Sequence, residues 1–269
     1  MEKLLINPYS ERGLIRDPEN FFGRRRELHD VYSQLAIEQS ISFGDEAELD
    51  VTITNFGNDG FTGSMIMALD GAHPLEEMTR EYWNPFFASV QTVRIGYLGE
   101  LDSRQLIADP IDQFPLRYEE EAIGRIAQLT QSHPYLAQSV CHNLVNRLND
   151  PLNRSNRATV EDVDAVLERT MESSGYYFDD YVWGWSNGDQ QLALALIAEA
   201  GEEADFSVVE KHLGREKALE ATRNLVAREI ITERTENGDL VFRFQIPLSR
   251  MWVQRTKTSA RVLLERGNL

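Results

Sequence analysis

The sequence predicts an α/β protein in which a parallel-sheet core is followed by a helical section and then by a module of helices and one β-hairpin. Short apolar runs of buried-strand length occur before residue 100. Amphipathic helical patterns take over from about Glu119. Near the carboxyl end, Asn237-Gly238 separates two alternating segments, which is a strong hairpin signal.

The core is expected to consist of a few short elements. Residues 1–20 carry turn formers such as Asn7-Pro8 and resemble an extended arm. Apolar positions recur at helical spacing between Arg24 and Gln39. Three apolar runs then have the length of buried strands: Ser40–Phe43, Ser64–Leu69 and Thr92–Ile95.

The helical section shows clear starting signals. Two amphipathic patterns are separated by Ser132-His133-Pro134, and Pro134 suits the first turn of the second helix, where its missing N–H has no helical partner to lose. Asp150-Pro151 ends that helix. Thr159 is expected to cap a third helix together with Asp162, in a capping box with Asp in place of Glu.

The last module has three helical patterns followed by the hairpin. The patterns cover Gln190–Ala200, Phe206–Gly214 and Arg215–Ile230. Three helices followed by a two-stranded hairpin is the order of a winged helix. The aromatic run Tyr176–Trp185 precedes them, and we expect it to pack as a hinge because Asp179-Asp180 within it argue against base stacking.

Composition narrows the functional classes. Cys141 is the only cysteine, so no internal disulfide is possible and a reducing cytoplasm is expected. The sequence shows no signal-peptide pattern and no apolar run near the roughly 18 residues that a membrane span needs. The five histidines are scattered, and adjacent Cys141 and His142 point to different helix faces, which argues against a zinc site.

The charge is strongly acidic and uneven. The net charge is −17, and residues 181–269 hold 12 Lys/Arg against 13 Asp/Glu, so the excess lies almost entirely in residues 1–180. Such a body repels phosphate backbones, and nucleic acid is therefore a conceivable partner only of the carboxyl-terminal part.

Four segments, taken in their order, resemble the STAND-type, AAA-plus-related P-loop ATPases of prokaryotes. They are NPYSERGLIRDPENFFGRRREL with its hhGRxxE pattern (Phe21 to Glu27), YWNPFF followed by VRIGYL, LTQSHPYLAQSVCHNLV, and VFRFQIPLSRMWV. The resemblance implies a P-loop NTPase-like core, a helical lid and a winged-helix domain. It also implies ATP or ADP with Mg²⁺ as cofactor, and a role as a nucleotide-dependent regulatory switch in signalling.

On this resemblance the chain divides into an arm (1–20), a core truncated near 43–63 (21–118), a helical lid (119–175), a winged helix (176–255) and a basic tail (256–269). In the family, the arginine of the first segment and the proline of the lid lie against adenine and ribose. The resemblance therefore implies that Gly23, Arg24, His133 and Pro134 bind the nucleotide. The alternative is that Arg24 belongs to a solvated helix start and that Pro134 only begins a helix.

The phosphate-binding loop of such a fold is missing. A P-loop needs glycines, a lysine for the β and γ oxygens, and a Ser or Thr for Mg²⁺. The chain has no Gly-Lys pair and no lysine between Leu4 and Glu210. Just after the first strand, where the loop belongs, Gly44 leads into Asp45 and Glu46, which repel phosphate. We therefore expect hydrolysis to be absent and nucleotide binding to be weak, and whether the chain is an enzyme stays open.

Asp45 and Glu46 have a second interpretation through the resemblance. In the family, an Asp-Glu pair ends a later strand, where the Asp holds the Mg²⁺ shell and the Glu polarises the attacking water. Asp45 would then be the metal residue and Glu46 the catalytic one, and the alternative is an ordinary solvated acidic turn. The missing loop has three open explanations: evolutionary loss leaving a pseudo-ATPase, a trimmed chain, or segments absent from this sequence.

The competing hypothesis is a non-catalytic protein-interaction or DNA-binding winged-helix adaptor. Its third helix carries four basic residues against two acidic ones: Arg215, Lys217, Arg223 and Arg228 against Glu216 and Glu220. This is weakly basic for a DNA reader, so DNA stays possible but disfavoured. The segment from Arg250 to Arg266 also offers apolar residues for docking, namely Met251, Trp252, Val262, Leu263 and Leu264. We expect a protein partner or self-association, and no membrane.

Overall fold

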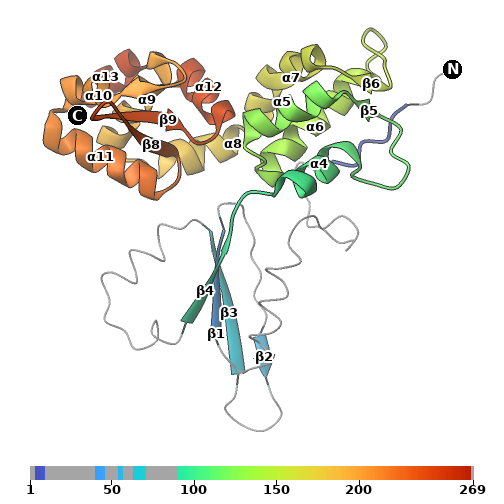
Figure 1. The fold of residues 1–269 in the computed structure, drawn as a ribbon, viewed down its shortest axis with the longest axis horizontal. Helices are drawn as coiled ribbons and strands as arrows, with labels where there is room; N and C mark the ends of the chain where they lie inside the picture. The colour runs from blue at the N-terminus through green and yellow to red at the C-terminus, as the bar shows by residue number, and fades with distance from the viewer. Residues whose placement is uncertain (1–3, 10–39, 46–53, 57–62, 71–89, 268–269) are drawn as a thin grey trace. The chain divides into compact units, whose positions relative to one another are not determined.

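The structure is a computed structural model and describes residues 4–9, 40–45, 54–56, 63–70 and 90–267 (Figure 1). The chain divides into two compact units. One contains Leu14–Leu106, and the other contains Met1–Gly13 together with Ile107–Leu269.

The smaller unit holds a four-stranded sheet in the order β2-β3-β1-β4. Its strands are β1 (Ser40–Asp45), β2 (Thr54–Phe56), β3 (Gly63–Asp70) and β4 (Val90–Ile95). β1 runs parallel to both β3 and β4, and β2 pairs with β3 in the antiparallel direction. The predicted α/β class with a parallel sheet is thus confirmed, and each of the three predicted apolar runs forms a strand.

The larger unit begins with a helical group. It contains α5 (Glu120–Thr130), α6 (Pro134–Asn149) and α7 (Val160–Ser173), preceded by α4 (Glu100–Ala108) at the junction of the two units. β5 (Arg117–Tyr118) and β6 (Arg157–Ala158) form a short parallel bridge. The group has an apolar core to which every turn of α6 contributes at least one buried apolar side chain, among them Leu136, Val140, Leu144 and Leu148.

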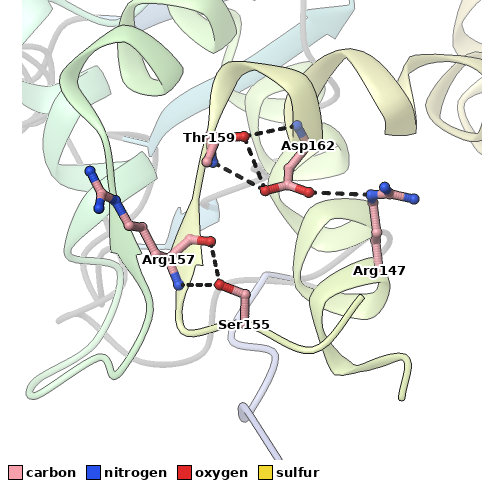
Figure 2. A network of polar contacts seen from close by, with 5 residues as sticks. All are labelled: Arg147, Ser155, Arg157, Thr159 and Asp162. Atoms are coloured by element: carbon pink, nitrogen blue, oxygen red, sulfur yellow. Dashed lines mark hydrogen bonds and ion pairs between the residues drawn. The ribbon is translucent and has the colours of Figure 1, made fainter. Parts of the chain in front are cut away.

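The start of α7 is held as the sequence predicts (Figure 2). The Asp162 backbone N–H donates to Thr159 Oγ1 at 3.3 Å, and the Thr159 N–H donates to Asp162 Oδ2 at 3.3 Å, which completes a capping box. Arg147 Nε lies 3.5 Å from Asp162 Oδ1, so the same carboxylate joins α6 to α7. In the preceding loop, Ser155 Oγ bonds both the N–H and the carbonyl of Arg157. The loop therefore enters α7 in a defined geometry.

A short irregular segment joins this group to the last module. It contains α8 (Gly175–Tyr177) and the π-helix η2 (Phe178–Gly184). The Trp185 N–H donates to the Asp180 carbonyl at 3.1 Å, one residue further back than in an α-helix. Phe178 is fully buried, and its ring stacks on Trp252 with centroids 5.5 Å apart. The aromatic run is therefore a packed connection between the two groups of helices.

The last module follows the predicted order of three helices and a hairpin. The elements are α9 (Gly188–Ala200), β7 (Ala204–Asp205), α10 (Phe206–Leu213), α11 (Arg215–Ala227), β8 (Ile231–Glu236) and β9 (Asp239–Phe244). The strands form an antiparallel sheet in the order β7-β9-β8. Asn237 and Gly238 have φ of 53° and 92°, the left-handed pair that a tight hairpin turn requires.

Two further helices, α12 (Pro247–Thr256) and α13 (Ser259–Gly267), complete the chain. α13 falls in the segment predicted as a basic tail, and its Val262 packs into an apolar cluster with Leu192 and Leu196 of α9. Among the described helices, none is long and apolar enough to cross a bilayer.

Candidate functional site

The predicted site residues fall into three groups in the structure. Gly23, Arg24 and Glu46 lie outside the described residues. Asp45 is the last residue of β1, in the smaller unit. His133 and Pro134 lie at the start of α6, in the larger unit.

Asp45 occupies a favourable position in the sheet. The chain goes from β1 to β3 on one side and then to β4 on the other, so the strand order reverses at β1. Ligands of open parallel sheets bind beyond the carboxyl ends of the strands at such a reversal. Asp45, at the carboxyl end of β1 and in register with Ile95 of β4, stands at that position.

A second aspartate, missed in the sequence analysis, ends the neighbouring strand. Asp70 is the last residue of β3 and is the register partner of Asp45. Its signal was visible, because an aspartate directly follows the apolar run SMIMAL. Carboxylates are the ligands that hard divalent cations prefer, so two aspartates on adjacent strand ends suit Mg²⁺.

The same edge suits a polyphosphate poorly. The sequence supplies no lysine between Leu4 and Glu210, so no ammonium group from this core can balance phosphate charge. Asp45 and Asp70 add negative charge on two adjacent strands. The sequence thus provides two aspartates at this edge and no P-loop lysine to hold a triphosphate.

The turn before α6 has an unusual backbone. Gln131 and Ser132 both have positive φ, 49° and 59°, although neither is glycine. Left-handed backbone costs about 1–2 kcal/mol for such a residue. The turn is held by hydrogen bonds from Ser132 N–H to the Ala127 carbonyl (3.1 Å) and from His133 N–H to the Thr130 carbonyl (2.9 Å). Gln131 is the C-cap of α5, and a left-handed residue is a common way to end a helix, so the turn ends α5 and leads directly into α6.

The two predicted residues of this turn differ in accessibility. His133 is 1% exposed, and its ring lies edge-on to Tyr177, with centroids 5.2 Å apart. Pro134 occupies the first turn of α6, as predicted, and stays half-buried. A ligand approaching the turn would meet Pro134 before the imidazole.

Arg228, counted in the sequence analysis as a candidate for DNA contact, is instead a buried structural residue. It is 5% exposed and donates to the Tyr181 carbonyl (2.7 Å), the Trp185 carbonyl (3.2 Å) and Ser186 Oγ (3.0 Å). Burial lowers the pKa of its guanidinium. The guanidinium of Arg228, the C-cap residue of α11, thus binds carbonyl groups within and just after η2 and fixes the carboxyl end of α11 to η2.

Six of the eleven other Lys and Arg residues of the last module form ion pairs that the structure describes. Arg215 pairs with Glu210, Arg234 with Glu203 and Glu236, Arg255 with Glu168, Lys257 with Asp179, Arg261 with Glu265, and Arg266 with Asp189. Of the five apolar residues predicted for docking, Trp252 and Val262 are buried and are therefore not available to contact a partner. The surface offered to DNA is therefore less basic than the sequence suggests.

Cys141 is fully buried on α6 beside Tyr9 and Tyr118. Desolvation raises the pKa of its thiol to about 12, and hydrogen bonds from the two tyrosines only partly oppose that rise. A thiol with this pKa is not a nucleophile at neutral pH. Among the residues that the structure describes, no group of three or more His, Cys, Asp or Glu side chains could hold a metal ion.

No protein-family model matches the chain, and no curated protein matches it. Among solved structures, it is similar to a Walker-type ATPase of Pyrococcus abyssi, with 15% identity and a TM-score of 0.51 over 85% of this chain. This chain spans 66% of the length of that ATPase. At this identity the likeness shows the fold alone. A RuvB mutant of Thermotoga maritima also matches, with 15% identity, 79% of this chain and 72% of that chain covered, and a TM-score of 0.31, which is too low to support an argument.

Proposed function

We propose that this chain is a nucleotide-responsive regulatory switch on a P-loop ATPase scaffold, and that it is deficient in hydrolysis. The observation that carries the proposal is the fold shared with a Walker-type ATPase over 85% of the chain. The resemblance of the sequence segments to STAND-type ATPases supports it independently. In this assignment α5 to α7 are the lid, and residues 176–255, from η2 through α12, are the winged-helix domain.

The residues have separate proposed roles. Asp45, supported by Asp70 on the adjacent strand end, would hold Mg²⁺, and Glu46 would occupy the position of the water-polarising acid. Gly23, Arg24 and Pro134, with His133 behind Pro134, would contact the nucleoside. Bound Mg²⁺ supplies charge neutralisation for phosphate oxygens. Because this chain adds no P-loop lysine, we assign no hydrolytic step to it.

The switch would move the lid and the winged helix together. Both belong to one compact unit, and η2 is held on one side by Arg228 and on the other by the stacking of Phe178 on Trp252. A nucleotide-dependent change is then a movement of this whole unit, which is one of the standard modes of domain switching.

The test is ATP titration by calorimetry on a chain whose intact mass has been measured. We expect weak ATP binding that does not saturate in the micromolar range, and no phosphate release above background. Micromolar affinity at the stated mass of 30.8 kDa would overturn the proposed deficiency. A mass clearly above 30.8 kDa would show that the working protein contains segments beyond this sequence, such as the missing loop.

The magnesium assignment is tested separately. Asp45→Asn and Asp70→Asn should each weaken Mg²⁺ binding at least about tenfold, because each removes one anionic ligand from a small site. Asp112→Asn is the matched control, an exposed aspartate of the other unit. Equal Mg²⁺ affinity in all three variants would remove the proposed metal site.

For partners, we favour a protein over DNA. Only Lys217 and Arg223 remain as exposed cations on α11 without a described ion pair, since Arg215 is paired and Arg228 is buried. We expect no retention on duplex DNA at low salt. Retention that weakens with salt and is lost in the Lys217→Ala, Arg223→Ala double variant would instead favour the DNA-binding adaptor.

A further inference from the structure

The amino-terminal segment Leu4–Tyr9 is docked on one polar face of α6. That face consists of His142, Asn146 and Asn149, spaced so that they lie in one row along the helix. We call these three residues, together with the residues around Tyr9 (Ile107, Phe114, Tyr118 and Cys141), the arm site. The docked segment and the arm site belong to the same compact unit.

Asn149 recognises the backbone of the segment. Its Oδ1 accepts from the Leu5 N–H at 2.7 Å, and its Nδ2 donates to the Leu5 carbonyl at 2.9 Å. The side-chain amide thus takes both hydrogen bonds that a neighbouring β-strand residue would take. His142 Nδ1 lies 2.9 Å from the Tyr9 carbonyl and contacts the backbone at the other end.

Asn7 is recognised through its side chain. Its Nδ2 donates to the His142 carbonyl and to Asn146 Oδ1, both at 3.0 Å. Its Oδ1 accepts from the Tyr9 N–H at 3.2 Å, which folds the segment into a local turn across Pro8. The fixed φ of Pro8 leaves less backbone entropy to lose on docking.

Tyr9 is the buried anchor. It is 4% exposed, and its hydroxyl donates to the Ile107 carbonyl at 2.5 Å and lies 3.0 Å from the Tyr118 hydroxyl. Its ring meets Phe114 edge-on, with centroids 5.9 Å apart. The Cys141 thiol lies beside both tyrosines, so the anchor covers the only thiol of the chain.

The segment has three large aliphatic side chains, of which Leu5 is half-buried and the other two are exposed. Leu4 and Ile6 are 59% and 66% exposed. The contacts of the segment therefore come from Asn7, Tyr9, the half-buried Leu5 and backbone hydrogen bonds, and backbone bonds combined with side-chain pockets are how domains that bind short linear peptides achieve affinity and specificity.

We propose that the arm site is a peptide-binding site for short segments that carry Asn-Pro-Tyr, and that Leu4–Tyr9 is its intramolecular and exchangeable occupant. The proposal does not depend on nucleotide binding. A tethered ligand has a millimolar effective concentration, so a free peptide competes poorly against an intact arm and well against a weakened one.

The test uses the full chain and a fluorescein-labelled peptide of residues 4–10. In fluorescence anisotropy, we expect the Asn7→Ala chain to bind the peptide at least about tenfold more tightly than the wild-type chain, because two hydrogen bonds of the tethered arm are lost. Ile6→Ala is the matched control and should bind as the wild type does. A peptide that itself carries Asn7→Ala should bind weakly to every chain. Equal binding of the two peptides, or no binding to the folded Asn7→Ala chain, would overturn the proposal.

Cys141 gives a second readout on the same proteins. Its labelling by a thiol reagent should be about tenfold faster in the Asn7→Ala chain and should slow again when the unlabelled peptide is added. A labelling rate that the peptide leaves unchanged would contradict exchange at this site.

If the Asn7→Ala chain does not fold, hydrogen exchange on the wild-type chain tests whether the arm is exchangeable. An exchangeable arm opens locally, so the amides of Leu5 and Tyr9 should exchange much faster than the core amides of α6. Protection equal to that of α6 would show that the arm is an inseparable part of the fold and would refute the proposal.

Discussion

The two ends of the larger unit are attached by different forces. The arm at the amino-terminal end is held on α6 by neutral amide and imidazole groups. The helices at the carboxyl end combine apolar packing with ion pairs. Lys257 Nζ lies 2.9 Å from Asp179 Oδ1 and over the rings of Trp183 and Trp252.

This difference has a consequence for how each attachment responds to solution conditions. Salt screens exposed ion pairs over about 10 Å at 0.1 M ionic strength and leaves neutral hydrogen bonds largely unaffected. The ion pairs of the carboxyl-terminal helices should therefore weaken with salt, while their apolar packing and the docking of the arm should not. The π-helix η2 is held by the buried guanidinium of Arg228. We expect the largest effects of mutation at this arginine.

Arg228→Ala should destabilise the larger unit by about 3 kcal/mol, because the change leaves the acceptors of Tyr181, Trp185 and Ser186 without their buried donor. Chemical denaturation measures the loss. Arg223→Ala, an exposed arginine of the same helix, should change stability by less than about 0.5 kcal/mol. Equal effects of the two changes would show that the buried arginine is not what fixes η2.

Gly184→Ala should destabilise by about 2 kcal/mol, since a Cβ at this position would lie 2.9 Å from the Asp179 carbonyl oxygen and force the π-helix to shift. Gly175 lies in the same segment, and a Cβ there would meet nothing within 4 Å. Gly175→Ala should therefore be neutral or slightly stabilising. Thermal melts that fall by the same amount for both variants would contradict the close approach at Gly184.

Alkaline pH should weaken the packing beneath the arm. The folded thiol of Cys141 has a pKa of about 12, against 9.0 for an ordinary thiol, so between these values the unfolded chain has lost a proton that the folded chain keeps. Stability then falls as pH rises from about 9 towards 12, by about 1 kcal/mol per pH unit from this group. In Cys141→Ala the decline should be shallower. An unchanged slope of unfolding free energy against pH would assign the decline to other groups.

Lys257→Met should have the smallest effect, about 0.5–1 kcal/mol, because the ion pair with Asp179 is partly exposed and the methionine keeps much of the packing on the tryptophans. The cost should shrink as salt is raised from 0.05 to about 0.5 M, since screening already weakens the wild-type pair. Asn149→Leu, which removes a neutral attachment of the arm, should show a cost that does not depend on salt.

Prediction from the sequence succeeded wherever a short stretch specifies its own geometry. Pro134 begins α6, Thr159 and Asp162 form the capping box, and Asn237-Gly238 turns the hairpin. It missed Asp70, since the partnership with Asp45 depends on which strands become neighbours in the sheet. It also misjudged Arg228, because a pattern of charges along α11 does not show which face the π-helix covers.

The candidate site, too, was predictable from the sequence in some features and not in others. The absence of a Gly-Lys pair and of any lysine between Leu4 and Glu210 is a property of residue identity, and the sequence alone establishes it. The same holds for helix starts and tight turns, because their causes act within about four residues. The docking of Leu5 on Asn149, 144 positions away, could be identified only in the tertiary structure. Contacts between distant residues depend on how whole elements pack, and no local pattern encodes them.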